Sequence, residues 1–468
     1  MEPLNRREFM GRAVAGAVLA AAGRGIAAQT PDRPPNFVVI VTDDHRNDMA
    51  GFAGHPILQT PEMDRLAAEG VWFRNAFVTT PICCTSRASI LTGMHARSHG
   101  VHEFSNNLPQ ALFEASYPAT LRRAGYRNGF VGKYGVGPNP PAEVLGLVPM
   151  PPGREVFFRE VDGERRHVTR ITGDQAVDFI RANPAGQPFC LSVSFDAPHS
   201  EDYARRPYPP EPEYEELYKD VTVPPPPLAD CEHYEALPEF LKNSEGRKRW
   251  GVRFCTPQFY QESMRDVFRM ITGVDAAIGR IRQALEEAGV ADNTVIVLMG
   301  DNGIFYGERG LAGKWYAYEE SIRVPLVVYD PALPENLRGR ALNPMALNID
   351  LAPTLLERAG IPRPETMQGR SLLPLARGES PEWRHDWYFE HLFRHPLIPR
   401  SEGVRDTGWT YIRWIDESPV MEELYDLEHD PHQVRNLAGD PAHAAILERL
   451  RNRWEELRRE LPERAAAS

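Results

Sequence analysis

Two short apolar segments, each followed by acidic side chains, constrain the fold of this chain most strongly. Residues 36–42 read Asn-Phe-Val-Val-Ile-Val-Thr, and residues 294–299 read Thr-Val-Ile-Val-Leu-Met. Continuous runs rich in β-branched residues are typical of strands buried on both faces, as in a parallel sheet. Asp43 and Asp44 follow the first run, and Asp301 and Asn302 follow the second after one glycine. These side chains are therefore predicted at the carboxyl ends of strands, where open α/β sheets bind ligands.

The chain between these two segments alternates helical and strand patterns. A helix is predicted at 61–69, with Thr60 as its cap, Pro61 at its first position and Gly70 at its end. Further helices are predicted at 117–125, 174–183 and 261–288, and further strands at 128–132 and 189–195. This alternation predicts an α/β fold with a mostly parallel central sheet flanked by helices.

Two other segments suggest the domain organisation. Residues 202–256 are rich in proline and acidic residues, and we expect an insertion over the face that carries the site. A solvated insertion without chemical consequence is an equal alternative. From residue 381, short aromatic strands and an amphipathic helix at 443–464 predict a smaller C-terminal α+β domain, which leaves 34–380 for the main domain.

The N-terminal segment 1–28 is predicted to be a targeting signal. It contains paired arginines, Arg6 and Arg7, then an uncharged alanine-rich run and small residues suited to cleavage. The pattern resembles the twin-arginine signal of bacteria, so we expect export to the periplasm or the medium by the twin-arginine machinery. An ordinary secretory signal and an interfacial helix are the alternatives.

Charge and cysteine content narrow the classes of function. The net charge of -12 argues against binding nucleic acid or an anionic membrane by bulk charge. Beyond the signal, no segment has the ~20 consecutive apolar residues of a membrane span. The five cysteines are sparse for a disulfide scaffold and fit no zinc template, although a disulfide between Cys231 and Cys255 stays open. An anionic substrate would require a local pocket of arginine and lysine.

The four polar residues after the two strands have the chemistry of a metal site. Asp43, Asp44 and Asp301 supply carboxylates and Asn302 an amide oxygen, which are ligands for hard cations such as Ca²⁺ or Mg²⁺. One acidic pair after a strand is explained as often by a turn or a helix cap. Two pairs in equivalent positions favour a metal site.

The segment at 83–93 carries a more specific signal. It reads Cys-Cys-Thr-Ser-Arg-Ala-Ser-Ile-Leu-Thr-Gly. It resembles the sulfatase signature Cys-x-Pro-Ser-Arg, in which the cysteine is oxidised after synthesis to formylglycine, an aldehyde. Further motifs follow in the order expected of that family: Gly132-Lys133-Tyr134, Ala197-Pro198-His199, 300–303, 310–314, 318–325, 350–354 and 423–431. The resemblance covers residues 36–440 and implies an alkaline-phosphatase-like fold, sulfuric ester hydrolysis and a bound Ca²⁺.

The resemblance also implies a role for each residue at the site. Formylglycine at position 83 would be the nucleophile, and one hydroxyl of its hydrate would attack sulfur while loss of a proton from the other would release sulfate. The ligands of Ca²⁺, which is favoured over Mg²⁺, would be Asp43, Asp44, residue 83, Asp301 and Asn302. Arg87 would orient the hydrated aldehyde from one helical turn away.

The remaining site residues would act on the substrate. Lys133 and Lys314 would contact sulfate oxygens, and His199 would protonate the leaving alcohol. Outside these motifs, His199 would be interpreted as a loop residue and Lys314 as a surface lysine.

Two positions depart from the family pattern. Thr85 stands where the signature has proline, although threonine also favours the extended conformation in which the maturing enzyme reads the segment. Gly135 stands where many sulfatases have a histidine that takes a proton during release; His95 or His99 could replace it, and packing is an equal explanation for both. Gly-Lys-Tyr without this histidine, and the doubled cysteine, resemble the glucosamine-6-sulfatase-like branch.

The expected substrate is a sulfated glycan, and the expected partner in maturation is a formylglycine-generating enzyme. Trp409, Tyr411 and Trp414, near Arg405 and Arg413, could contact a sugar, or they could belong to a core strand of the small domain. A phosphonate or phosphate-ester hydrolase using the same site is one alternative function. A protein with unmodified Cys83 that binds without catalysis is the other.

Overall fold

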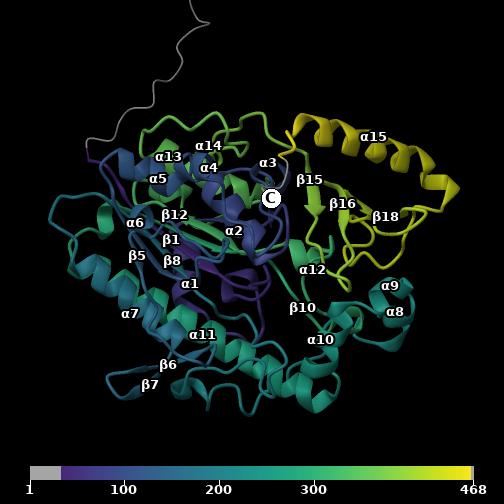
Figure 1. The fold of residues 1–468 in the computed structure, drawn as a ribbon, viewed down its shortest axis with the longest axis horizontal. Helices are drawn as coiled ribbons and strands as arrows, with labels where there is room; N and C mark the ends of the chain where they lie inside the picture. Colours follow the sequence, from purple (N-terminus) through teal and green to yellow (C-terminus); the bar gives the residue numbers. More distant parts are fainter. Residues whose placement is uncertain (1–32, 465–468) are drawn as a thin grey trace, which may run out of the picture.

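The computed structural model describes residues 33–464, and its centre is an eight-stranded sheet (Figure 1). The predicted signal at 1–28 lies outside the described residues. The strands, in their order across the sheet, are β13 (Arg340–Leu342), β2 (Val71–Phe73), β12 (Leu326–Tyr329), β9 (Thr294–Gly300), β1 (Asn36–Thr42), β8 (Phe189–Ser194), β4 (Arg127–Gly132) and β5 (Leu147–Val148). Only β12 runs antiparallel to its neighbours, so the predicted mostly parallel α/β sheet is confirmed.

The register of the central strands brings the two acidic motifs together. β1 pairs in parallel with both β8 and β9, and all seven of its residues are buried, as its apolar run predicts. Thr42, the last residue of β1, lies opposite Gly300, the last residue of β9. The residues that follow each strand therefore leave the same edge of the sheet side by side.

Helices cover both faces of the sheet (Figure 1). The side chains of β1 alternate between two cores, with Phe37, Val39 and Val41 in one and Val38 and Ile40 in the other. The first core includes residues of α2 (Cys83–Thr92), α5 (Tyr117–Arg123) and α13 (Leu351–Arg358). The second includes residues of α1 (Pro61–Glu69), α7 (Val168–Arg181) and α11 (Pro257–Glu287). Helix α7 begins before the predicted 174 because His167 caps it, accepting the Thr169 N–H.

The N-terminus of α1 is capped by a residue from another helix. Pro61 and Gly70 stand at its ends as predicted, and Thr60 occupies the N-cap position, but its side chain makes no capping hydrogen bond. The Thr60 hydroxyl instead accepts the Gly51 N–H and donates to Asp64. Oδ1 of Asp275, on α11, accepts the backbone N–H groups of Glu62 at 3.1 Å and Met63 at 2.8 Å.

Replacing Asp275 by alanine should lower the free energy of unfolding by about 1–2 kcal/mol, because two buried N–H groups of α1 would lose their acceptor. Asp275→Asn keeps an acceptor oxygen and should cost less. Urea denaturation measures both, with Glu286→Ala, an exposed acid on the same helix, as the control. Equal stability of Asp275→Ala and Glu286→Ala would show that the cap contributes nothing.

A four-stranded antiparallel sheet forms the C-terminal region. It consists of β15 (Asp386–His391), β16 (Ser401–Asp406), β17 (Trp409–Trp414) and β18 (Met421–Asp426), and α15 (Ala444–Glu460) packs on it. Trp414 and Tyr411 are buried in two different cores, and Trp409 packs against the second. Arg405 pairs with Glu319, and Arg413 stacks on Trp454. Of the two alternatives for these aromatic residues, the core strand is therefore the one that the structure shows, because they form the core of this sheet.

The proline-rich segment 202–256 contains short helices and runs toward the sheet edge that carries the acidic motifs. Its helices are α8 (Cys231–Glu235), α9 (Glu239–Lys242) and α10 (Glu245–Arg253). Helix α10 packs against β11 (Ala312–Gly313), which directly precedes Lys314. Cys231 and Cys255 are free thiols. Within 33–464, no helix has the length and apolarity needed to cross a membrane.

Candidate active site

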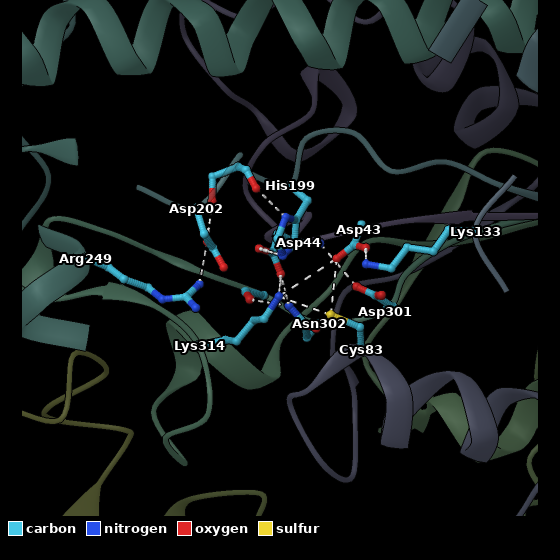
Figure 2. A network of polar contacts seen from close by, with 12 residues as sticks. Asp43, Asp44, Cys83, Lys133, His199, Asp202, Arg249, Asp301, Asn302 and Lys314 are labelled. Carbon is cyan, nitrogen blue, oxygen red and sulfur yellow. Dashed lines mark hydrogen bonds and ion pairs between the residues drawn. The ribbon is translucent and has the colours of Figure 1, made fainter. Parts of the chain in front are cut away.

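Polar side chains converge where β1 and β9 end (Figure 2). The Asp44 N–H donates to Oδ1 of Asp301 at 3.1 Å, and the Asn302 amide donates to Oδ1 of Asp44 at 2.5 Å. Asp43, Asp44, Asp301 and Asn302 are all buried. Asp44 has a φ of 58°, a left-handed conformation that is uncommon for a residue other than glycine and is often found at functional sites. The four residues therefore form one buried cluster, as their positions after the strands predict.

Cys83 begins α2, and its side chain enters this cluster. Its Sγ lies 3.5 Å from Oδ1 of Asp43 and 3.2 Å from Nζ of Lys314. Burial and the negative charge of Asp43 raise the pKa of the Cys83 thiol to about 12. A thiol with this pKa stays protonated at neutral pH and is a poor nucleophile as it stands.

Arg87 lies one turn after Cys83 on α2 and connects three of the strand ends. Its guanidinium donates to Oδ2 of Asp301 at 2.8 Å, to Oδ2 of Asp43 at 3.3 Å and to the Lys133 carbonyl at 2.8 Å. A Cβ atom on Gly135 would lie 2.8 Å from Cδ of Arg87, and Gly135 has a φ of +70°. Arg87 therefore fills the space beside Gly135, and a larger residue at this position would collide with it.

Lys133 and Lys314 supply further positive charge. The Lys133 ammonium pairs with Oδ2 of Asp43, and the Lys314 ammonium pairs with Oδ1 of Asp44. Burial alone would lower the pKa of Lys314, but the charge of Asp44 outweighs it and raises this pKa above its usual value. Lys314 is buried and charged, which contradicts its interpretation as a surface lysine.

His199 faces the second carboxylate oxygen of Asp44, the one that Lys314 does not bind. Its Nε2 is 3.7 Å from Oδ2 of Asp44, and its Nδ1 lies 2.6 Å from the Ser200 carbonyl oxygen. Because Nδ1 faces a carbonyl oxygen, it carries a hydrogen and leaves Nε2 directed at the cluster. Burial and the charge of Lys314 lower the pKa of His199 to about 4, so an anionic group must approach before this histidine is protonated at neutral pH.

The geometry is suited to a hard cation. Ligand atoms of Asp43, Asp44, Cys83 and His199 all lie within 4.8 Å of one another. Oδ1 of Asn302 is buried and accepts no hydrogen bond from the described residues, which is unusual for a buried amide oxygen. Carboxylate oxygens together with this free oxygen fit a divalent cation. Of the four residues whose ligand atoms lie this close together, His199 alone is absent from the predicted set of ligands.

Two other predicted residues lie outside this cluster, and two that were not predicted belong near it. Nε2 of His99 bonds Ser89 at 3.0 Å and its Nδ1 accepts the Val101 N–H; within 33–464, neither His95 nor His99 contacts the cluster.

Ser194, at the end of β8, accepts a hydrogen bond from Arg87. Burial raises the pKa of Asp196, and the positive charges of Lys133 and Arg87 offset only part of this rise. Their position at the end of β8 and directly beyond it, on a strand that neighbours β1, was the signal that could have identified both.

Comparisons with known proteins agree with this fold and site. The sequence model of the sulfatase family matches residues 35–361, and that of the C-terminal domain of N-sulphoglucosamine sulphohydrolase matches residues 307–460. An N-acetylglucosamine-6-O-sulfatase of Bacteroides thetaiotaomicron is 27% identical over 496 residues, which cover 91% of this chain and 86% of the relative.

Solved structures show the same architecture. A protein in complex with its substrate D-glucosamine-2-N,6-O-disulfate superposes with a TM-score of 0.80 and 25% identity, covering 92% of this chain and 98% of the other. The phosphonate monoester hydrolase of Agrobacterium radiobacter shares the fold, with a TM-score of 0.75, 23% identity and coverage of 92% and 96%.

The fold, the site and these matches together define a sulfuric ester hydrolase. Since the family model covers more than half of its length, the chain belongs to the sulfatase family. Within that family it is similar to the glucosamine-6-sulfatases.

Proposed function

We propose that this sulfatase hydrolyses sulfate esters of a glucosamine-containing glycan or its oligosaccharides, with formylglycine formed from Cys83 and with Ca²⁺. The observation that carries the proposal is the position of Cys83, whose side chain lies between the carboxylate of Asp43 and the ammonium of Lys314. Relatives that are N-acetylglucosamine-6-sulfatases and a neighbour bound to a sulfated glucosamine support the substrate class.

Residue 83 would provide the nucleophile. When Cys83 is converted to the aldehyde, its hydrate supplies one hydroxyl to attack sulfur and a second whose deprotonation releases sulfate. Arg87, held by Asp43 and Asp301, would keep this hydrate in position from one turn along α2.

The surrounding charges would bind sulfate and complete the reaction. Lys133 and Lys314 would meet sulfate oxygens and stabilise the charge that develops on them. The pKa of His199 would rise as the anion of the substrate offsets Lys314, so that its Nε2 could hold the proton for the leaving alcohol. Asp43, Asp44, Asp301 and Asn302 would hold Ca²⁺, which supplies positive charge to a sulfate oxygen.

Substrate selectivity tests this proposal against phosphate-ester or phosphonate hydrolysis. We expect kcat/KM for 4-nitrophenyl sulfate to exceed that for 4-nitrophenyl phosphate and for a phenylphosphonate ester by ~100-fold or more. The phosphonate is the 4-nitrophenyl ester, so initial rates of nitrophenol release measure all three reactions. The leaving group is the same in each, so differences in rate report on the group that is transferred. Higher turnover of the phosphorus esters would favour the alternative function.

Maturation and export would take place in a defined order. All ten residues of α2 are buried, so a formylglycine-generating enzyme must reach Cys83 before the chain folds. Conversion in the cytoplasm, then folding and export by the twin-arginine machinery to the periplasm or the medium, satisfies this requirement. Replacing Arg6 and Arg7 by lysine should retain active enzyme in the cytoplasmic fraction, whereas unchanged export would point to an ordinary secretory signal.

A further inference from the structure

We propose that Asp202, Tyr203 and Arg249 form a subsite that binds uncharged hydroxyl groups of the sugar that carries the sulfate. The inference rests on the proposed function and adds to it the residues that select the sugar. None of the three residues belongs to the cluster around Cys83.

The three residues lie beside the catalytic cluster. Asp202 is three residues after His199, and its carboxylate accepts from the Ser200 hydroxyl at 3.3 Å. Arg249, on α10, lies next to the segment that carries Lys314: a Cβ atom on Gly313 would be 3.5 Å from Cδ of Arg249, and the Arg249 guanidinium stacks 4.9 Å from the Trp315 ring centroid. Figure 2 shows Asp202 and Arg249 facing each other at one side of the cluster, next to His199 and Lys314.

The contacts of Asp202 and Arg249 fix the pair but leave one atom of each available. Oδ1 of Asp202 accepts from Nη1 of Arg249 at 2.9 Å and from Nη2 of Arg253 at 2.7 Å. Nε of Arg249 donates to Glu245 at 3.0 Å. Within 33–464, no hydrogen bond reaches Oδ2 of Asp202 or Nη2 of Arg249, and the Asp202 side chain is 38% exposed. A fixed acceptor and a fixed donor therefore lie side by side, an arrangement that suits two neighbouring hydroxyl groups.

The charge of this group favours an uncharged ligand. Arg249 and Arg253 are balanced by Asp202 and Glu245, all four joined by ion pairs. An additional sulfate at Arg249 would lie beside the Asp202 carboxylate and be repelled. Hydroxyl groups can donate to Asp202 and accept from Arg249 without adding charge.

Tyr203 adds an apolar surface beside the polar pair. The residue is 57% exposed. Its hydroxyl donates at 2.5 Å to the carboxylate oxygen of Glu245 that also binds Arg249. Its φ of 60° places it in the left-handed region that residues other than glycine rarely adopt. An exposed aromatic ring held at its far end is suited to pack on the apolar face of a sugar.

The test compares two substrates that differ in the leaving group. N-acetylglucosamine-6-sulfate carries sugar hydroxyls, and 4-nitrophenyl sulfate carries none. In Arg249→Gln and Asp202→Asn, the ratio of kcat/KM for the sugar sulfate to kcat/KM for the aryl sulfate should fall by about 10-fold or more. In Tyr203→Ala, which alters an exposed side chain and should fold normally, KM for the sugar sulfate should rise about 5-fold.

Lys248→Gln is the matched control for Arg249→Gln. Lys248 is exposed on the same helix, its replacement removes the same charge, and its side chain makes no hydrogen bond within the described residues, so the ratio should stay at the wild-type value. Ratios unchanged in all three variants, or equal losses on both substrates, would overturn the subsite. A larger loss for glucosamine-2-N,6-O-disulfate than for N-acetylglucosamine-6-sulfate in Arg249→Gln would overturn its assignment to uncharged groups. If the wild-type enzyme cleaves neither sulfate, the proposed function itself fails.

Discussion

Replacing Cys83 by alanine is expected to abolish sulfate ester hydrolysis, with kcat/KM lowered by ~10⁴-fold or more, because in the proposed mechanism the nucleophile derives from this side chain. Alanine leaves the surroundings of residue 83 in place but offers no group that can attack sulfur. Initial rates on 4-nitrophenyl sulfate measure the loss. Cys84→Ala is the matched control, since this neighbouring thiol is buried in a hydrophobic core and its one polar contact among the described residues is a weak one with Thr85. Activity in Cys83→Ala comparable to that of Cys84→Ala would contradict the role of Cys83.

Mass spectrometry of the natively expressed protein tests the chemistry of the same residue. The tryptic peptide 75–87 contains both Cys83 and Cys84, so alkylation followed by fragmentation distinguishes the two positions. Conversion to formylglycine should make residue 83 about 18 Da lighter than an unalkylated cysteine and should leave an alkyl group on Cys84 alone. Active enzyme with an intact thiol at position 83 would exclude the formylglycine mechanism. Thr85→Pro should raise the converted fraction if threonine slows recognition by the maturing enzyme.

Replacing Asp44 by asparagine is expected to lower kcat/KM by ~10³-fold and to weaken Ca²⁺ binding, because a buried carboxylate of the proposed Ca²⁺ site loses its charge. The same change removes the nearer of the two buried carboxylates that pair with Lys314, so part of the loss should persist at saturating Ca²⁺. Calcium titration by calorimetry and kinetics with and without added Ca²⁺ measure the two effects separately.

Asp48→Asn provides the control for this substitution. Asp48 lies in the same loop and loses the same charge, but its side chain is 53% exposed and pairs with Arg46 outside the cluster. We expect its calcium affinity and kcat/KM to remain within about twofold of wild type. Equal calcium affinity in Asp44→Asn and Asp48→Asn would show that Asp44 is not a ligand.

The cluster around Cys83 could largely be predicted because each of its parts has a local signal. The runs at 36–42 and 294–299 identify buried strands, and the residues that follow them must reach one sheet edge if the strands are parallel neighbours. Arg87 follows Cys83 by one helical turn, so the helical spacing alone places both on one side of α2. The resemblance to the sulfatase family, carried by the order of the short motifs, then pointed to Lys133, His199 and Lys314. The structure places all three in the same cluster.

Features that depend on contacts between distant segments could not be predicted. Thr60 is a good capping residue by type, yet its hydroxyl bonds Gly51 and Asp64 while Asp275, more than 200 positions away, caps the helix. Trp414 and Tyr411 alternate along a strand in a way that fits either a binding surface or a core, and only the packing of the C-terminal sheet decides that they are buried. Gly135 is informative only once Arg87 is seen to occupy the space beside it.

The sequence by itself determined the class of fold, the edge of the sheet that carries the chemistry and the residues of the cluster around Cys83, because these follow from strand periodicity, helical spacing and short motifs. Only the tertiary structure decided that α10 of the segment 202–256 packs beside Lys314, with Arg249 paired to Asp202 next to His199. The physical reason is that Asp202 and Arg249 stand 47 positions apart at the two ends of this segment. Their pairing depends on how the segment folds back on itself, and no periodicity or spacing encodes such a contact.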